Sequence, residues 1–96
     1  MTQLEIEILL IKSVTEIQEH SGRKSVEITS DMTPLEDLED FDSLNGVEVT
    51  VDIFEKMQLD LEFNNVFLMD DKVLSIKEAA ARINEQALKA TKHGGN

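Results

Sequence analysis

The sequence predicts an all-α protein, an antiparallel four-helix bundle of three longer helices and one short helix. Three segments carry apolar residues every three or four positions, the spacing that places them on one face of a helix. At three points a hydroxyl residue is followed three positions later by glutamate, a pair that can satisfy two free amides at a helix start. These pairs are Thr2 with Glu5, Thr33 with Glu36, and Ser75 with Glu78.

The first helix is predicted from Thr2 to about Glu19, with apolar residues spaced to form one broad buried face. The apolar residues are Leu4, Ile8, Leu10, Ile11, Val14 and Ile17. Gly22 suits the helix end, because glycine adopts the left-handed conformation that is common there. His20 stands near the negative end of the helix dipole, where a cation is favourable.

Residues 21–42 form a long connection, and residues 26–29 alternate briefly as a strand would, with no second strand to pair with. Long connections are often pinned to the core by their own side chains. A short helical turn that begins with Thr33 and Pro34 would provide this attachment. The side chains expected to reach the core are Leu35, Leu38 and Phe41.

The second long helix is predicted over residues 43–57, with Asp42 or Ser43 as its N-cap. Ser43 has Gly46 where the glutamate of a capping box would stand. Its hydroxyl is therefore not held in such a box, and no bulky side chain is expected at that place on the helix surface. An anion attached to Ser43 would lie against free amides and the positive end of the helix dipole. This helix start is suited to carry a phosphoester.

The second helix carries two apolar stripes and an acidic face, and its periodicity alone does not decide which stripe faces the core. One stripe consists of Leu44, Val47, Val51 and Phe54. The other consists of Val49, Ile53 and Met57. The acidic face consists of Asn45, Glu48, Asp52 and Glu55.

Beyond the second helix, residues 59–63 alternate as an extended link would, and a short third helix is predicted around residues 65–69. Ser75 then begins the last helix. Its core-facing residues are expected to be Ile76, Ala80, Ile83 and Ala87. Residues 91–96 contain two glycines and are predicted to be a mobile end. Residues 1–90 therefore form a single domain.

The chain has 96 residues and a formal net charge of −11, which is concentrated in one region. Residues 31–62 hold eleven of the twenty acidic residues and only one basic residue, Lys56. This distribution argues against a nucleic-acid partner and favours basic protein surfaces. The chain has no cysteine, so any thiol must come on a prosthetic group. No apolar run exceeds four residues and no signal peptide is evident, so we expect a cytoplasmic protein without a membrane span.

The region around Ser43 resembles the modification site of the acyl carrier protein family. The resemblance is carried by residues 33–38 (Thr-Pro-Leu-Glu-Asp-Leu), by Asp42-Ser43-Leu44 and by residues 47–49 (Val-Glu-Val). It implies that Ser43 bears a 4′-phosphopantetheine arm, which a phosphopantetheinyl transferase moves there from coenzyme A. The terminal thiol of the arm would hold an acyl group as a thioester. The chain would then be a carrier in place of an enzyme, and we expect it to be monomeric.

The resemblance also implies which way the second helix faces. In the family, the positions that match Val49, Ile53 and Met57 point inward. The opposite surface would meet the acyl-loading and acyl-processing enzymes of fatty-acid, polyketide or related biosynthesis, with its acids against basic residues of those enzymes. The residues on this surface would be Asp42, Leu44, Glu48, Val51, Asp52 and Glu55. Phe54 stands where the family often has an acid, and residues 62–74 lack a proline that the family commonly has there.

Two other functions fit parts of the sequence. Residues 40–46 suggest the start of an EF-hand loop, but Leu44 and Val51 stand where oxygen ligands are required. The acidic face still leaves an alternative function: an acidic helical interaction module or calcium-binding module without a prosthetic group. A hydrolase with Ser43 as nucleophile would need a base, and neither histidine of the chain has a recognisable partner. Two isolated histidines also make a poor metal site.

Overall fold

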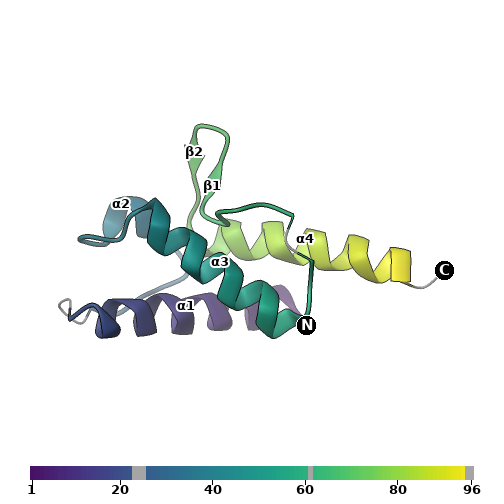
Figure 1. The fold of residues 1–96 in the computed structure, drawn as a ribbon, viewed down its shortest axis with the longest axis horizontal. Coiled ribbons are helices and arrows are strands. Elements are labelled where there is room, and N and C mark those ends of the chain that lie inside the picture. The colour runs from purple at the N-terminus through teal and green to yellow at the C-terminus, as the bar shows by residue number, and fades with distance from the viewer. Residues whose placement is uncertain (23–25, 61, 95–96) are drawn as a thin grey trace.

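The computed structural model describes residues 1–22, 26–60 and 62–94 and is mostly helical (Figure 1). In chain order its elements are α1 (Gln3–His20), α2 (Pro34–Asp37), α3 (Ser43–Met57), β1 (Leu68–Met69), β2 (Lys72–Val73) and α4 (Ile76–Gly94). The long helices α1, α3 and α4 lie where the sequence predicts them. The short helix α2 lies at the helical turn that the sequence predicts from Thr33 and Pro34.

Helix α1 begins at the capping box that the sequence predicts. The Thr2 hydroxyl accepts from the Glu5 amide at 3.2 Å, and the Glu5 carboxylate accepts from the Thr2 amide at 2.8 Å. Just past its end, Gly22 has a φ of +69°, the left-handed conformation for which glycine is suited. The capping box at the start of α1 and the glycine past its end were therefore both predicted correctly from the sequence.

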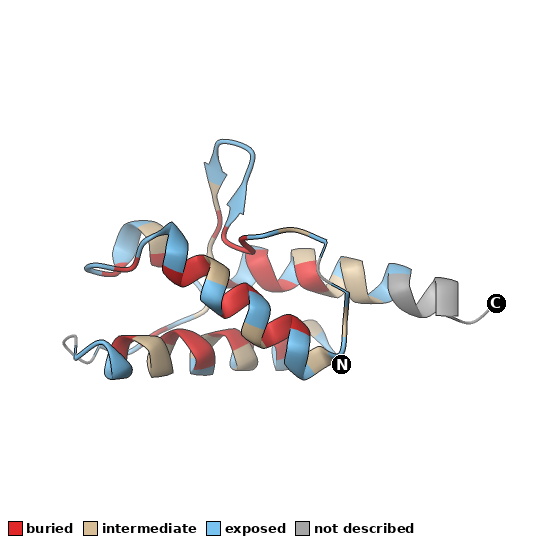
Figure 2. Ribbon diagram, in the orientation of Figure 1, coloured by how far each residue is buried: buried red, intermediate tan, exposed pale blue. Residues whose placement is uncertain are grey.

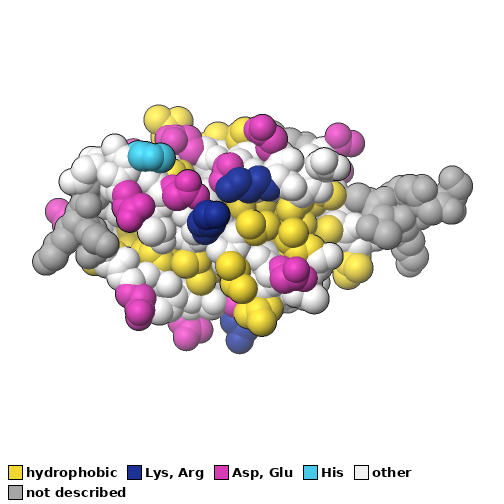
Figure 3. Space-filling model, turned by 90° about the horizontal axis from the view of Figure 1, so that it is seen from below, with side chains coloured by type: hydrophobic (Ala, Val, Ile, Leu, Met, Phe, Trp, Pro, Cys, Tyr) yellow, Lys and Arg dark blue, Asp and Glu magenta, His cyan; other side chains and the backbone are white. Residues whose placement is uncertain are grey.

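Only part of the apolar surface of α1 is buried. Ile6, Leu10 and Val14 are fully buried, whereas Leu4 is 64% exposed and Ile8 57% exposed. The predicted broad buried face is therefore wrong for Leu4 and Ile8, because α3 and α4 pack against the arc that contains Ile6 and Leu10. Seen from below, on the side of α1, the molecule shows hydrophobic side chains gathered between charged ones (Figure 3).

The connection before α3 has no strand in its described part, so the brief alternation of residues 26–29 did not lead to one. The predicted capping box of Thr33 and Glu36 is also wrong: the Thr33 side chain makes no capping bond, and its amide donates to Asp37 at 2.7 Å. Pro34 occupies the first position of α2, where its fixed φ suits a helix. α2 is a single turn, and the Asp37 carboxylate accepts from the amide of Thr33, the residue before the helix. Leu38 and Phe41 are buried and attach the connection to the core, as predicted.

Residues 65–69 form no helix, and this prediction is wrong. β1 and β2 pair as an antiparallel hairpin with Leu68 opposite Val73 and Met69 opposite Lys72 (Figure 1). Asp70 lies in the turn with a φ of +57°, a conformation that aspartate tolerates better than most residues. The consecutive residues Val66 and Phe67, just before the hairpin, both point into the core.

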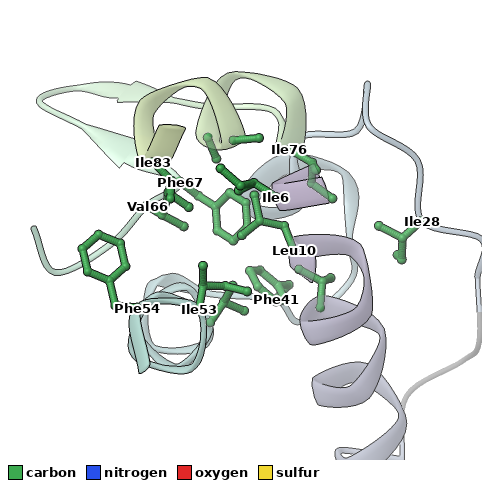
Figure 4. Packing of buried hydrophobic residues seen from close by; sticks show 14 of the residues in the cluster. Ile6, Leu10, Ile28, Phe41, Ile53, Phe54, Val66, Phe67, Ile76 and Ile83 are labelled. Carbon is green, nitrogen blue, oxygen red and sulfur yellow. The ribbon is translucent and has the colours of Figure 1, made fainter. Parts of the chain in front are cut away.

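The core lies where α1, α3 and α4 meet, and buried positions line the facing sides of all three helices (Figure 2). Figure 4 shows Phe67 at its centre, with Leu10 from α1 and Ile53 from α3 pointing toward it. The Phe41 and Phe67 rings pack edge to face with centroids 6.0 Å apart. Phe54 is also buried and packs edge to face against Phe63 at 5.2 Å, so it is not presented on the surface.

Helix α4 begins at the predicted box of Ser75 and Glu78, and its first half packs on α1 while its last turns extend past the start of α1 (Figure 1). It runs to Gly94, so most of the end predicted to be mobile belongs to this helix, and residues 95–96 lie outside the described residues. Of the helices in the described ranges, none is long and apolar enough to cross a membrane.

Candidate functional site

The start of α3 is held by Asp42. Its carboxylate accepts from the Asn45 amide at 3.1 Å, and the Asn45 side-chain oxygen accepts from the Asp42 amide, also at 3.1 Å. Asp42 and Asn45 thus form a reciprocal capping box, which resolves the choice between Asp42 and Ser43 as the N-cap. Asn45 is buried, so it differs in exposure from Glu48 and Glu55, with which the sequence grouped it on one face.

Ser43 is the first residue of α3 and is exposed to solvent. Because Asp42 caps the helix, the Ser43 hydroxyl has no hydrogen bond to another residue in the described part of the chain. Its neighbour Leu44 is 67% exposed. At this position a group attached to the hydroxyl would lie beside the first-turn amides and the positive end of the helix dipole.

Gly46 does not face solvent, so the expectation of an open place on the helix surface is wrong. Gly46 is buried, and a Cβ added there would lie 2.5 Å from both Oδ1 and Nδ2 of Asn65. Its carbonyl accepts from the Thr50 hydroxyl at 2.7 Å. The glycine therefore makes room for a side chain that arrives from a distant segment.

Asn65 and Thr50 connect the segment before the hairpin to the first turns of α3. Asn65 Nδ2 donates to the carbonyl of Ser43 at 3.1 Å, and Asn65 Oδ1 accepts from the Phe67 amide at 3.0 Å. The Thr50 hydroxyl accepts from the Val66 amide at 2.7 Å. Neither residue was identified from the sequence, although a glycine inside a predicted helix is a sign of close approach by another group.

Arg82 of α4 holds the same segment from the other side. Its Nη1 donates to the carbonyls of Asn65 at 3.1 Å, Val66 at 3.4 Å and Leu68 at 3.0 Å. The guanidinium carbon lies 3.8 Å from the centre of the Phe63 ring, within reach of a cation–π interaction. Burial lowers the pKa of Arg82 and the charge of Asp70 opposes this, but an arginine stays protonated.

The outward face of α3 carries most of the residues predicted to meet partners. Val51 is 47% exposed, and Glu48 and Glu55 are exposed as well. Asp52 differs, because its carboxylate accepts from the Ser13 hydroxyl of α1 at 2.9 Å and lies 3.3 Å from Lys56 Nζ. The second apolar stripe faces inward as the resemblance implies, for its buried members are Val49 and Ile53, with Met57 partly buried.

The acidic residues around the start of α3 do not converge on a common point. Asp42 is used as a cap, and Asp40 has a left-handed backbone with φ +62° in the preceding turn. Across the described ranges, no group of three or more histidine, cysteine, aspartate or glutamate side chains is placed to hold a metal ion.

No family model matches the chain, and no curated protein or solved structure matches it.

Proposed function

We propose that this protein is an acyl carrier protein, with Ser43 as the attachment residue for a 4′-phosphopantetheine arm. The observation that carries the proposal is the exposed serine at the first position of α3, whose capping role has been taken over by Asp42. A hydroxyl that holds no structural bond within the described chain can be esterified at little cost to the fold. The pattern Asp42-Ser43-Leu44 supports the same assignment through its resemblance to the family.

The chemistry of attachment suits this position. The Ser43 hydroxyl oxygen would attack the phosphorus that bears the pantetheine of coenzyme A, the bond between the two phosphates would break, and adenosine bisphosphate would leave. The hydroxyl proton would pass to a base of the transferase. The new phosphodiester keeps one negative charge, which the helix dipole of α3 favours. Because the chain has no cysteine, the only thiol of the loaded protein would be that of the arm.

The outward face of α3 would serve as the surface that partner enzymes read. Leu44 and Val51 offer apolar contact, and Glu48 and Glu55 offer charge toward basic residues. Exposed acids of this kind mainly steer the encounter and set its orientation. The proposed partners are a phosphopantetheinyl transferase and the enzymes that load and process the acyl group. The carrier itself would catalyse no step.

The test is the intact mass of the protein after incubation with coenzyme A, magnesium and a phosphopantetheinyl transferase of broad specificity. We expect the wild type to gain the mass of one phosphopantetheine and Ser43→Ala to gain none. Ser21→Ala is the matched control, because Ser21 is also exposed and lies at a helix end. This control should be loaded like the wild type.

A second arm of the experiment uses the transferase encoded with this protein, in case the first enzyme is too selective. The proposal is overturned if the folded wild type gains no mass with either transferase. It is also overturned if Ser43→Ala is loaded, since the arm would then be attached elsewhere.

A further inference from the structure

The carbonyl of Ser43 is bound by a residue twenty-two positions further along the chain. Asn65 Nδ2 donates to this carbonyl at 3.1 Å, while Asn65 Oδ1 accepts from the Phe67 amide at 3.0 Å. The side-chain nitrogen thus binds α3, and the side-chain oxygen binds the segment that carries Asn65. Asn65 is only 8% exposed, so losing either bond would leave a polar group buried without a partner.

Three contacts fix the position of the Asn65 side-chain amide. Gly46 leaves it the space that any Cβ would fill. Arg82 binds the Asn65 carbonyl at 3.1 Å from α4. The Thr50 hydroxyl accepts from the amide of the next residue, Val66, at 2.7 Å. A side chain held in this way has one orientation, and it imposes one orientation on the carbonyl that it binds.

We propose that Asn65 is a positioning residue for Ser43: by holding the Ser43 carbonyl, it fixes the direction in which the first turn of α3 presents the serine hydroxyl to the transferase. This inference rests on the proposed function. The hydroxyl makes no bond of its own within the described chain, so its orientation depends on the backbone that carries it. In a transfer reaction, a displacement of about 1 Å in a reacting group can cost roughly 100-fold in rate.

The first test is Asn65→Asp, which keeps the size and the oxygen that accepts from Phe67 but replaces the donor to Ser43 by a second acceptor. We expect kcat for phosphopantetheine transfer to fall about 10- to 100-fold with little change in KM. Asn64→Asp is the matched control, because it adds the same charge at the neighbouring exposed position. This control should load at the wild-type rate.

The pH dependence of Asn65→Asp separates positioning from a general structural effect. A buried carboxylate that faces a carbonyl oxygen has a raised pKa, and when protonated it donates a hydrogen bond. Among the described residues, Arg82 is the charged group that binds this segment, through the Asn65 carbonyl, and the Asp42 carboxylate caps the start of α3. The rate of the variant relative to the wild type should therefore recover as pH falls, and the Asn64→Asp ratio should not change.

The second test disturbs the contact between Asn65 and Ser43 by a substitution in α3. Gly46→Ala places a methyl group against the Asn65 amide and should lower kcat in the same way. If both variants act by displacing this amide, the double variant will be no slower than the slower single one. Ile83→Val, a core change far from the serine in sequence, controls for lost stability, and each variant is assayed below its own unfolding transition.

The outcomes distinguish this inference from the proposed function. If the wild type loads and folded Asn65→Asp and Gly46→Ala load at its rate, the positioning role is overturned and the carrier stands. Losses that are additive, or that Ile83→Val reproduces, also overturn it. If the wild type is not loaded at all, the carrier proposal fails and the positioning role fails with it. Should Asn65→Asp not fold, Gly46→Ala alone decides.

Discussion

The N-cap of α3 is Asp42, and this assignment separates two neighbouring residues by their roles. Asp42 accepts from the Asn45 amide and so contributes to the stability of the helix, whereas the Ser43 side chain holds nothing within the described chain. Asp42 thus stabilises the helix, and the next residue, Ser43, keeps a hydroxyl that the described part of the fold does not use. The sequence alone allowed either of them to be the cap.

Substitution of the two residues by alanine should therefore have different effects on stability. We expect Asp42→Ala to lower the free energy of unfolding by about 1 kcal/mol, the usual loss of an N-cap. Ser43→Ala should change it by less than about 0.5 kcal/mol, as exposed substitutions generally do. Urea unfolding followed by circular dichroism measures both. A larger loss for Ser43→Ala would show that the serine has a structural role.

Helix α4 depends on the capping box at its start. The Ser75 amide donates to Glu78 at 2.9 Å, and Lys72 of the hairpin lies 3.5 Å from the same carboxylate. The bond from Ser75 is the main reason that the pKa of Glu78 is held below its ordinary value of 4.5, and Lys72 adds to this effect. The box therefore joins the helix to the hairpin electrostatically.

The stability of the protein should depend on pH through Glu78. Because the pKa is lowered in the folded state, the stabilisation is present above the ordinary value of 4.5 and is lost as pH falls through the folded-state value. Glu78→Gln keeps a side-chain oxygen for Ser75 but cannot titrate. We expect its melting temperature to lie below that of the wild type near neutral pH and to approach it in acid. A difference that stays constant with pH would contradict this account.

The molecule as a whole presents its acids unevenly. Residues 31–62 include α3 and hold most of the net negative charge, while the remaining two thirds of the chain is nearly balanced. The radius of gyration is 13.0 Å, close to the roughly 12.5 Å expected of a compact chain of this length. The acidic residues are therefore close together in space. A field of this kind speeds association with a basic partner by about 10-fold or more and weakens with salt.

Association with the transferase should follow this charge distribution. We expect Glu48→Gln with Glu55→Gln to slow association and flatten its dependence on ionic strength, with little effect on the dissociation rate. Asp52→Asn should have a smaller effect, because Asp52 is already paired with Lys56. Stopped-flow binding over a salt series measures these rates. Glu27→Gln, outside α3, is the control, and an equal effect there would show that only net charge matters.

The sequence by itself determined the long helices and the capping residues of α1 and α4. Capping pairs and apolar periodicity involve residues three or four positions apart, so Thr2 with Glu5 and Ser75 with Glu78 could be read without knowledge of the fold. Ser43 was placed at the start of α3 in the same local way, and the structure then showed that it is exposed. The box predicted at Thr33 failed because the Thr33 amide donates to Asp37 in place of Glu36, and the Thr33 side chain makes no capping bond.

The tertiary structure alone decided which faces are buried and what surrounds Ser43. Two apolar stripes of α3 compete for one core, and only the packing of α3 on α1 and on the shared core selects Val49 and Ile53 over Val51. The segment before the hairpin is held to α3 by bonds between residues sixteen and twenty-two positions apart, from Val66 to Thr50 and from Asn65 to Ser43. Such bonds are set by how helices pack, which no local pattern encodes.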